Sequence, residues 1–350
     1  MFTNKKLLSK REWIQKMVSV PSIELTPEEA DQFLTYLIDQ SVLKNNARIE
    51  RMAKNEKLIR ALGFGAGRFL KPAGTFVKAT HAKTDFSQNK ITLTSKKVKG
   101  CVPVYDDDLE DIGDGAAFKA NLMKLVAAKI ANELDEAAYI SDTHDLGGFG
   151  DTDIRSIWDG WRYQITNSGE GKDYHNDVSG AAVVIDAEGA KIVEREVAAP
   201  YDFAFMYADA LKQLDSMYKT VGLSALRFWN NDQITTDYMN SLAKRGTALG
   251  DSVITGKISP VYNTVPIVSC PLMPLTLDSA GVLDGNSGEN YTDVLLTPGQ
   301  NLIIGLQREL TIEADRNAAE DCTDMYYTMR ACFAIENINA CVLIKNLVVA

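Results

Sequence analysis

The sequence is poor in the residues that form disulfide frameworks and metal centres. Its 350 residues include five cysteines, an odd number scattered mostly through apolar segments, so we expect reduced core thiols and no disulfide network. The cysteines are Cys101, Cys270, Cys322, Cys332 and Cys341. The histidines are His81, His144 and His175. None of them is spaced as a ligand pair with another histidine or a cysteine, so no zinc or other metal site is expected.

Long apolar runs and catalytic motifs are also missing. No apolar run approaches the roughly 20 residues that a membrane span requires, and the first residues turn polar too early for a signal peptide. Residues 63–68 (GFGAGR) match neither nucleotide-binding pattern, and no serine elbow or His-Glu-x-x-His helix occurs. We therefore expect a protein that folds in the cytoplasm, contacts no membrane, catalyses no reaction and needs no cofactor.

The charge that is present is unevenly distributed. The chain has 37 Lys plus Arg against 47 Asp plus Glu, a formal net charge of -10. Residues 1–100 carry 19 basic and 9 acidic residues, which leaves 18 basic and 38 acidic residues for 101–350. The protein is thus a basic front segment joined to an acidic body.

The basic front has too few apolar residues to form a core of its own. Thr26, Pro27 and Glu29 predict the start of one helix, and 44–62 is predicted as a second, polar helix that carries six basic residues. Residues 90–96 (KITLTSK) alternate between polar and apolar residues, and Gly and Pro punctuate the stretch before them, which predicts a long two-stranded hairpin over 63–100. Because an isolated hairpin is marginal in water, these segments must dock elsewhere.

The acidic body mixes helices with strands, so the predicted fold class is α+β. Predicted helices lie at 115–140, 201–220 and 232–244. Predicted strands lie at 98–105, 226–229, 265–270, 294–296, 302–306, 310–313, 325–333 and 340–344. The stretch from His144 to Gly180 is rich in glycine and is predicted as loop, with aromatic residues at Trp158, Trp161 and Tyr163.

The basic front has two interpretations. Lysines and arginines can neutralise nucleic-acid phosphates, but the interleaved aromatic residues match no single-strand or RNA-binding module. Alternatively, the basic front contacts the acidic body of a neighbouring copy, which an arm and a hairpin that must dock elsewhere favour. On this hypothesis the candidate inter-subunit contacts are Arg68, Lys71, Lys78, Lys83, Lys90, Lys96, Lys97 and Lys99.

Several segments, taken in order, carry a family resemblance. An arm containing 25–30 (LTPEEA) precedes the basic hairpin, and 102–111 (VPVYDDDLED) then leads into the long helix. Residues 227–231 (RFWNN) precede another helix, and 329–335 (MRACFAI) precede a closing strand. In this order the segments resemble the major capsid proteins of tailed bacteriophages, which share the Hong Kong 97 fold.

The resemblance implies a domain organisation and a function. The implied units are an N-terminal arm 1–62, an E-loop hairpin 63–100, a peripheral (P) domain 101–199 with spine helix 115–140, an axial (A) domain 200–300 and returning strands 301–350. The implied function is structural: self-assembly as hexamers and pentamers into an icosahedral head that encloses double-stranded DNA.

The resemblance also implies partners and a location. The partners are other copies of the chain, a portal, a decoration protein and the packaged DNA. Because the family's coiled-coil prefix is missing, a separate scaffolding protein, or scaffolding by the short arm itself, is implied as well. The expected location is the virion, after assembly in the cytoplasm of a host bacterium.

Two alternatives stay open. An encapsulin-like compartment would share the fold, although the long arm disfavours it. A cytosolic enzyme that uses a thiol or a nucleotide would belong to a different class of protein, and no motif supports it.

Overall fold

The computed structural model describes residues 23–24 and, from residue 46 onward, much of the chain. The described residues are 23–24, 46–64, 86–105, 115–144, 153–167, 173–176, 182–185, 191–197, 203–214, 216–220, 222–244, 260–277, 291–307, 311–317 and 319–348. The described helices are α4 (Gly115–Ile140), α5 (Trp161–Asn167), α6 (Phe203–Gln213), α7 (Ser216–Lys219) and α8 (Asp232–Ala243). Within these residues no helix combines the length and the apolar character needed to cross a bilayer.

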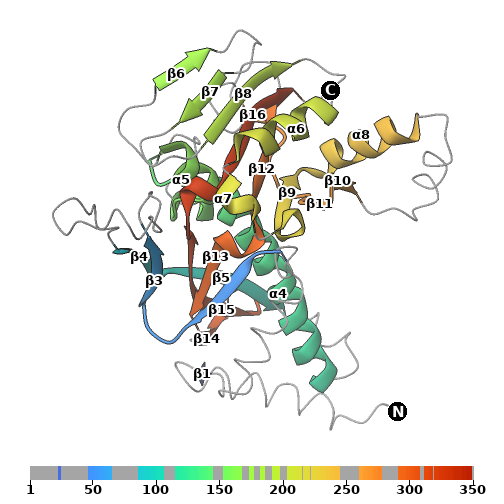
Figure 1. Cartoon of the computed structure of the whole chain (residues 1–350). Coiled ribbons are helices and arrows are strands. Elements are labelled where there is room, and N and C mark those ends of the chain that lie inside the picture. The colour runs from blue at the N-terminus through green and yellow to red at the C-terminus, as the bar shows by residue number, and fades with distance from the viewer. Residues whose placement is uncertain are drawn as a thin grey trace, which may run out of the picture.

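The described strands form two large sheets and a separate hairpin (Figure 1). Their bounds are β1 (Ile23–Glu24), β2 (Arg48–Met52), β3 (Glu56–Phe64), β4 (Phe86–Thr94), β5 (Lys96–Tyr105), β6 (Asp173–Asn176), β7 (Ala182–Ile185), β8 (Lys191–Val197), β9 (Leu226–Asn230), β10 (Val261–Tyr262), β11 (Val265–Ser269), β12 (Tyr291–Pro298), β13 (Leu302–Gln307), β14 (Thr311–Asn317), β15 (Cys322–Ile335) and β16 (Val342–Val348).

The first sheet is built around the long strand β15, and we call it the β15 sheet. One edge of β15 pairs antiparallel with β14 and then with β13, while its other edge pairs antiparallel with β5. Strand β2 extends the sheet as the parallel neighbour of β13, and β1 as the antiparallel neighbour of β14. Successive residues of a strand point to opposite faces, so one face of β15 can face the core while the other faces away.

Helix α4 packs against the core face of the β15 sheet. Small and apolar residues recur along one side of the helix and are buried: Val126, Ala127, Ala131, Leu134, Ala137 and Ala138. They share one core cluster with Met325, Tyr327 and Met329 of β15. The predicted helix at 115–140 is confirmed at both ends, because its apolar stripe has a sheet face to cover.

The second sheet has eight strands in the order β10-β11-β9-β12-β16-β8-β7-β6 and occupies the upper part of Figure 1. Its core cluster includes residues from helices α6 and α8. Aromatic rings fill this core: Phe203, Tyr207, Phe228, Tyr238 and Tyr262. The buried hydroxyl of Tyr207 accepts a hydrogen bond from Asn230 Nδ2 at 2.7 Å, so a polar group inside the core is satisfied.

A buried ion pair connects the two halves of the subunit. Arg162 Nε of α5 donates to Asp293 Oδ2 of β12 at 2.5 Å, and Tyr139 of α4 lies 3.5 Å from the same oxygen. Asp293 sits where the pairing of β12 with β16 shifts register, a local irregularity of the kind that redirects a side chain. Burial, with Asp293 nearby, holds the pKa of the Tyr139 phenol well above its usual value. The pair ties helices α4 and α5 to a strand of the second sheet.

The hairpin consists of β3 and β4 and is anchored by its inward side chains. Ile59, Ile91 and Leu93 join a small apolar cluster with Met52 of β2 and Ile303 of β13. The paired strands begin at Glu56, inside the range predicted for the arm. At the other end, the residues from Lys96 onward belong to β5 and therefore to the β15 sheet rather than to the hairpin.

The predicted helix at 44–62 is wrong. Residues 48–52 form β2, which pairs with β13, and residues 56–64 form β3, which pairs with β4. Backbone pairing with strands far along the chain outweighs the local pattern in this segment. Part of the predicted arm is thus a strand of the β15 sheet, whereas the helix predicted to start at Thr26 lies outside the described residues.

Three further expectations need correction. The stretch predicted as loop up to Gly180 contains α5 and β6. The predicted helix at 201–220 is divided into α6 and α7. All five cysteines are free thiols, but Cys101 is exposed, so the core-thiol prediction is wrong for that residue and right for the other four. Strands β5, β9 and β11 to β16 and helix α8 lie at or near their predicted positions.

Candidate assembly surfaces

The exposed face of the hairpin carries the first group of candidate contacts. Lys90 of β4 lies directly opposite Arg60 of β3, and both side chains are exposed. Leu58, two residues along the same face, is 46% exposed. Like charges directly opposite each other are destabilising, so this face favours an anionic neighbour. The other hairpin candidates lie outside the described residues: Arg68, Lys71, Lys78 and Lys83.

The remaining candidates, Lys96, Lys97 and Lys99, lie on β5, and two of them have partners within the subunit. Lys96 Nζ donates to the backbone oxygen of Ile157 at 2.7 Å. Lys99 Nζ lies 3.2 Å from Glu313 Oε2 of β14. Such exposed pairs contribute little to stability, about 0–1 kcal/mol, so they do not prevent these lysines from contacting another molecule.

Lys97 lies on the face of the β15 sheet that points away from α4. Its cross-strand partner is Arg330 of β15, so two cations face each other. We call this surface the outer face and define it by Asp324, Tyr326 and Arg330 of β15 together with their cross-strand partners on β5 and β14. The basic residues Lys97 and Arg330 mark one end of it.

The other end of the outer face is acidic. Asp315 of β14 lies directly opposite Asp324 of β15. The turn that joins these two strands adds Glu320 and Asp321, which are both exposed. The outer face therefore changes from basic to acidic along the strand direction, within a single surface.

The acidic end shifts the titration of the groups beside it. Desolvation and then the charge of Asp324 raise the pKa of the Cys101 thiol. Burial and then Asp324 raise the pKa of the Cys322 thiol in the same way. The charges of Cys101 and Asp324 raise the pKa of the Tyr326 phenol. Each shift favours the neutral form of the group, as expected where the local potential is negative.

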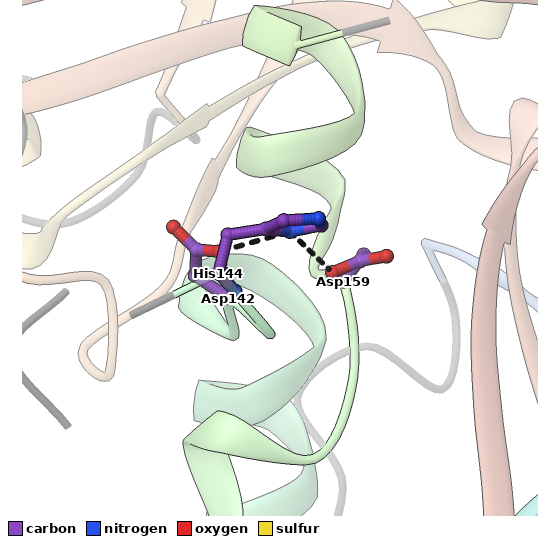
Figure 2. A group of neighbouring side chains, drawn as sticks. All are labelled: Asp142, His144 and Asp159. Atoms are coloured by element: carbon purple, nitrogen blue, oxygen red, sulfur yellow. Dashed lines mark hydrogen bonds and ion pairs between the residues drawn. The ribbon is translucent and has the colours of Figure 1, made fainter. Parts of the chain in front are cut away.

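A second polar cluster joins the end of α4 to the start of α5 (Figure 2). His144 Nδ1 lies 3.7 Å from Asp142 Oδ1 and 3.9 Å from Asp159 Oδ1. The imidazole stacks on Tyr163 with ring centroids 4.9 Å apart. His144 is isolated in the sequence, because Asp159 comes close to it only through the path of the chain between the helices.

The hydrogen bonds of this cluster account for its geometry. Asp159 Oδ1 accepts from the backbone N–H and the hydroxyl of Thr143 at 3.2 and 2.6 Å. Asp142 Oδ1 accepts from the backbone N–H of His144 at 2.7 Å. One possible metal-ligand atom from each of Asp142, His144 and Asp159 lies within 4.8 Å of the other two, a spacing that a cation could bridge. Since the facing oxygens already accept hydrogen bonds, the cluster is explained as a structural link between the two helices.

Sequence reasoning missed the acidic residues that share a surface with the candidate lysines. Asp315 and Asp324 lie just beyond the strands predicted at 310–313 and 325–333, and continuing the alternation of those strands marks both residues as outward-facing. Their position opposite each other, and their location on the same face as Lys97, follow only from the pairing register of three strands. The period-two alternation could have found the residues but not the arrangement.

The long helix packed on the β15 sheet, the second sheet and the projecting hairpin together define a phage capsid fold, as comparison with solved structures shows. A chain of the satellite phage P4 procapsid including size determination (Sid) protein matches with a TM-score of 0.62 and 13% identity, over 99% of this chain and 98% of that chain. The capsid of the native GTA particle matches with a TM-score of 0.55 and 17% identity, over 88% of this chain and 90% of that chain.

Sequence comparison agrees with the structural one. The chain is 24% identical over 316 residues to the "Putative prophage capsid protein YqbE" of Bacillus subtilis (strain 168), across 90% of this chain and 89% of that protein. No family model matches the chain. The expected α+β capsid fold and the resemblance to phage capsid proteins are confirmed.

Proposed function

We propose that this protein is the structural subunit of a phage head and that many copies assemble into an icosahedral shell. The main observation in support of this proposal is that the structural similarity to a procapsid chain extends over 99% of this chain and 98% of that chain. The capsid fold thus accounts for nearly the whole length of the protein. A structural role needs a stable core and surfaces for association; the packed core face of the β15 sheet and its charged outer face support the proposal.

Within this proposal the subunits form hexamers and pentamers, and the closed shell encloses double-stranded DNA without reading its sequence. The resemblance to capsid proteins supports further partners, namely a portal, a scaffolding protein and a decoration protein. Assembly takes place in the cytoplasm of the host bacterium, and the product is the virion. The same resemblance supports the domain roles assigned above: arm, E-loop hairpin, peripheral domain and axial domain.

The candidate basic residues act in this proposal as contacts between neighbouring subunits. The arrangement of Lys90 opposite Arg60 supports it, since a pair of like charges gains free energy from an anionic neighbour. Arg68, Lys71, Lys78 and Lys83 belong to the same proposed contact, and so do Lys96, Lys97 and Lys99 of β5. Charge complementarity of this kind orients partners and weakens as salt screens it.

Electron microscopy of the purified full-length protein tests the proposal. We expect closed shells, tubes or ring-shaped capsomers. Compact monomers or dimers at every protein and salt concentration would contradict it. The contents of the shells separate a phage head from an encapsulin-like compartment: co-purified nucleic acid or empty shells fit the head, and a specifically enclosed enzyme fits the compartment.

A further inference from the structure

Two pairs of like charge lie on the outer face of the β15 sheet. Asp315 is directly opposite Asp324, and Lys97 is directly opposite Arg330. Asp324 and Arg330 are six positions apart on β15, an even step, so their side chains and those of their cross-strand partners share the face that points away from α4. Six residues at the rise of a strand place the two pairs about 20 Å apart.

The centre of the outer face is satisfied within the subunit. Lys99 pairs with Glu313 at 3.2 Å and lies 4.4 Å above the ring of Tyr326. At the two ends, by contrast, no ion pair among the described residues includes Asp315, Asp324, Lys97 or Arg330. Like charges directly opposite each other destabilise a sheet, so each end raises the free energy of the isolated subunit.

The arrangement of both ends identifies the chemistry of the partner. A nucleic acid would satisfy the basic end, but the acidic end would repel its phosphates. A uniformly basic protein would satisfy the acidic end and be repelled by the basic end. A partner that suits both ends carries an acidic and a basic patch about 20 Å apart, as the outer face of another copy of this chain does.

We propose that the outer face is a contact surface for a second copy of this chain, with the Asp315–Asp324 pair of one copy against the Lys97–Arg330 pair of the other. This inference rests on the proposed self-assembly and names a surface through which it occurs. A two-fold arrangement pairs both ends at once, and a head-to-tail arrangement pairs one end with each neighbour; both satisfy the charges. The contact places two carboxylates of one copy against two cations of the other, so each like-charge pair gains neighbours of opposite sign.

Reversal of one end at a time tests the contact. K97E/R330E makes both ends of the face acidic, and D315K/D324K makes both ends basic. Each double variant keeps a like-charge pair at the same position, so its subunit stability should stay near that of the wild type. Light scattering and sedimentation should show that each variant alone needs a roughly tenfold higher concentration, or more, to assemble.

A mixture of the two variants is the matched control. Equal amounts should assemble near the wild-type concentration and form particles that contain both chains, because acidic ends now meet basic ends. The contact is overturned if either double variant assembles like the wild type. It is also overturned if both variants are folded by circular dichroism and still fail to assemble together.

Single variants keep the test decisive should a double variant fail to fold. K97E and D315K each turn a like-charge pair into an ion pair, so they should fold at least as well as the wild type and yet assemble less readily. Assembly equal to the wild type would overturn the contact. Wild-type chains that stay monomeric would contradict the proposed function as well, whereas wild-type shells with unaffected variants would contradict this contact alone.

Discussion

The two faces of β15 carry different chemistry on alternate residues of one strand. Met325, Tyr327 and Met329 are each 3% exposed and pack into the core with α4. Asp324, Tyr326 and Arg330 occupy the even-numbered positions that alternate with them and point to the outer face, where charges are concentrated. One face therefore stabilises the subunit, and the other is available to join subunits. Because side chains alternate between the faces, a substitution on one face of β15 leaves the side chains of the other face in place.

The largest expected difference between the faces is in folding stability. Met329→Ala should lower the free energy of unfolding by about 2–5 kcal/mol, because it leaves a cavity under α4. Arg330→Ala, the neighbouring residue on the outer face, should change the free energy of unfolding by no more than about 0.5 kcal/mol. Urea unfolding of unassembled subunits measures both values. Equal losses would show that the outer face is also part of the packed core.

A pH experiment tests the core face through Tyr327. Burial raises the pKa of this phenol to about 12, whereas an unfolded tyrosine has a pKa of about 10. Between these values the folded chain keeps a proton that the unfolded chain has lost, so stability should fall as pH rises, by up to about 1.4 kcal/mol per pH unit from this group.

Tyr327→Phe is the matched control for that experiment. Phenylalanine keeps the ring and lacks the titrating group, so the decline in unfolding free energy between pH 10 and pH 12 should be shallower by the contribution of one group. The hydroxyl contacts Met325 Sδ at 4.0 Å, so little stability at neutral pH should be lost with it. An unchanged slope would mean that the Tyr327 hydroxyl is reached by solvent.

The smallest expected effect on folding stability is that of Lys97→Glu, which should change stability and assembly in opposite directions. Lys97→Glu should pair with Arg330 and raise the free energy of unfolding by about 0.2–1 kcal/mol, because a like-charge pair becomes an ion pair. The same variant should assemble less readily. Urea unfolding compared with light scattering tests both effects. A variant that gains stability and assembles like the wild type would show that the repulsion between Lys97 and Arg330 is unrelated to subunit contact.

Helix α4 and the segment 48–64 show how far the sequence predicts the fold. α4 was predicted over its full length because its apolar stripe repeats at helical spacing and needs one face to cover. β2 and β3 were predicted as helix because their local pattern is polar and carries no clear alternation. They are strands because β13 and β4 offer backbone partners, and β13 lies about 250 residues away in sequence.

The candidate contacts show the same limit. The charge asymmetry of the sequence predicts contacts at Lys97 and Lys99, and the structure places both residues on β5 with exposed side chains. The acidic residues Asp315 and Asp324 were not singled out, since nothing local distinguishes them from other surface carboxylates. Their significance comes from pairing across β14, β15 and β5, and register between distant strands cannot be obtained from residue types alone.

Thiol labelling of Cys101 tests most directly whether the outer face joins subunits. Cys101 lies on this face opposite Tyr326 and is exposed, while the other four cysteines are buried and serve as internal controls. We predict that a maleimide labels Cys101 in dissociated wild-type subunits and that the same thiol is protected in assembled shells. Equal labelling of Cys101 in subunits and in shells would contradict the account.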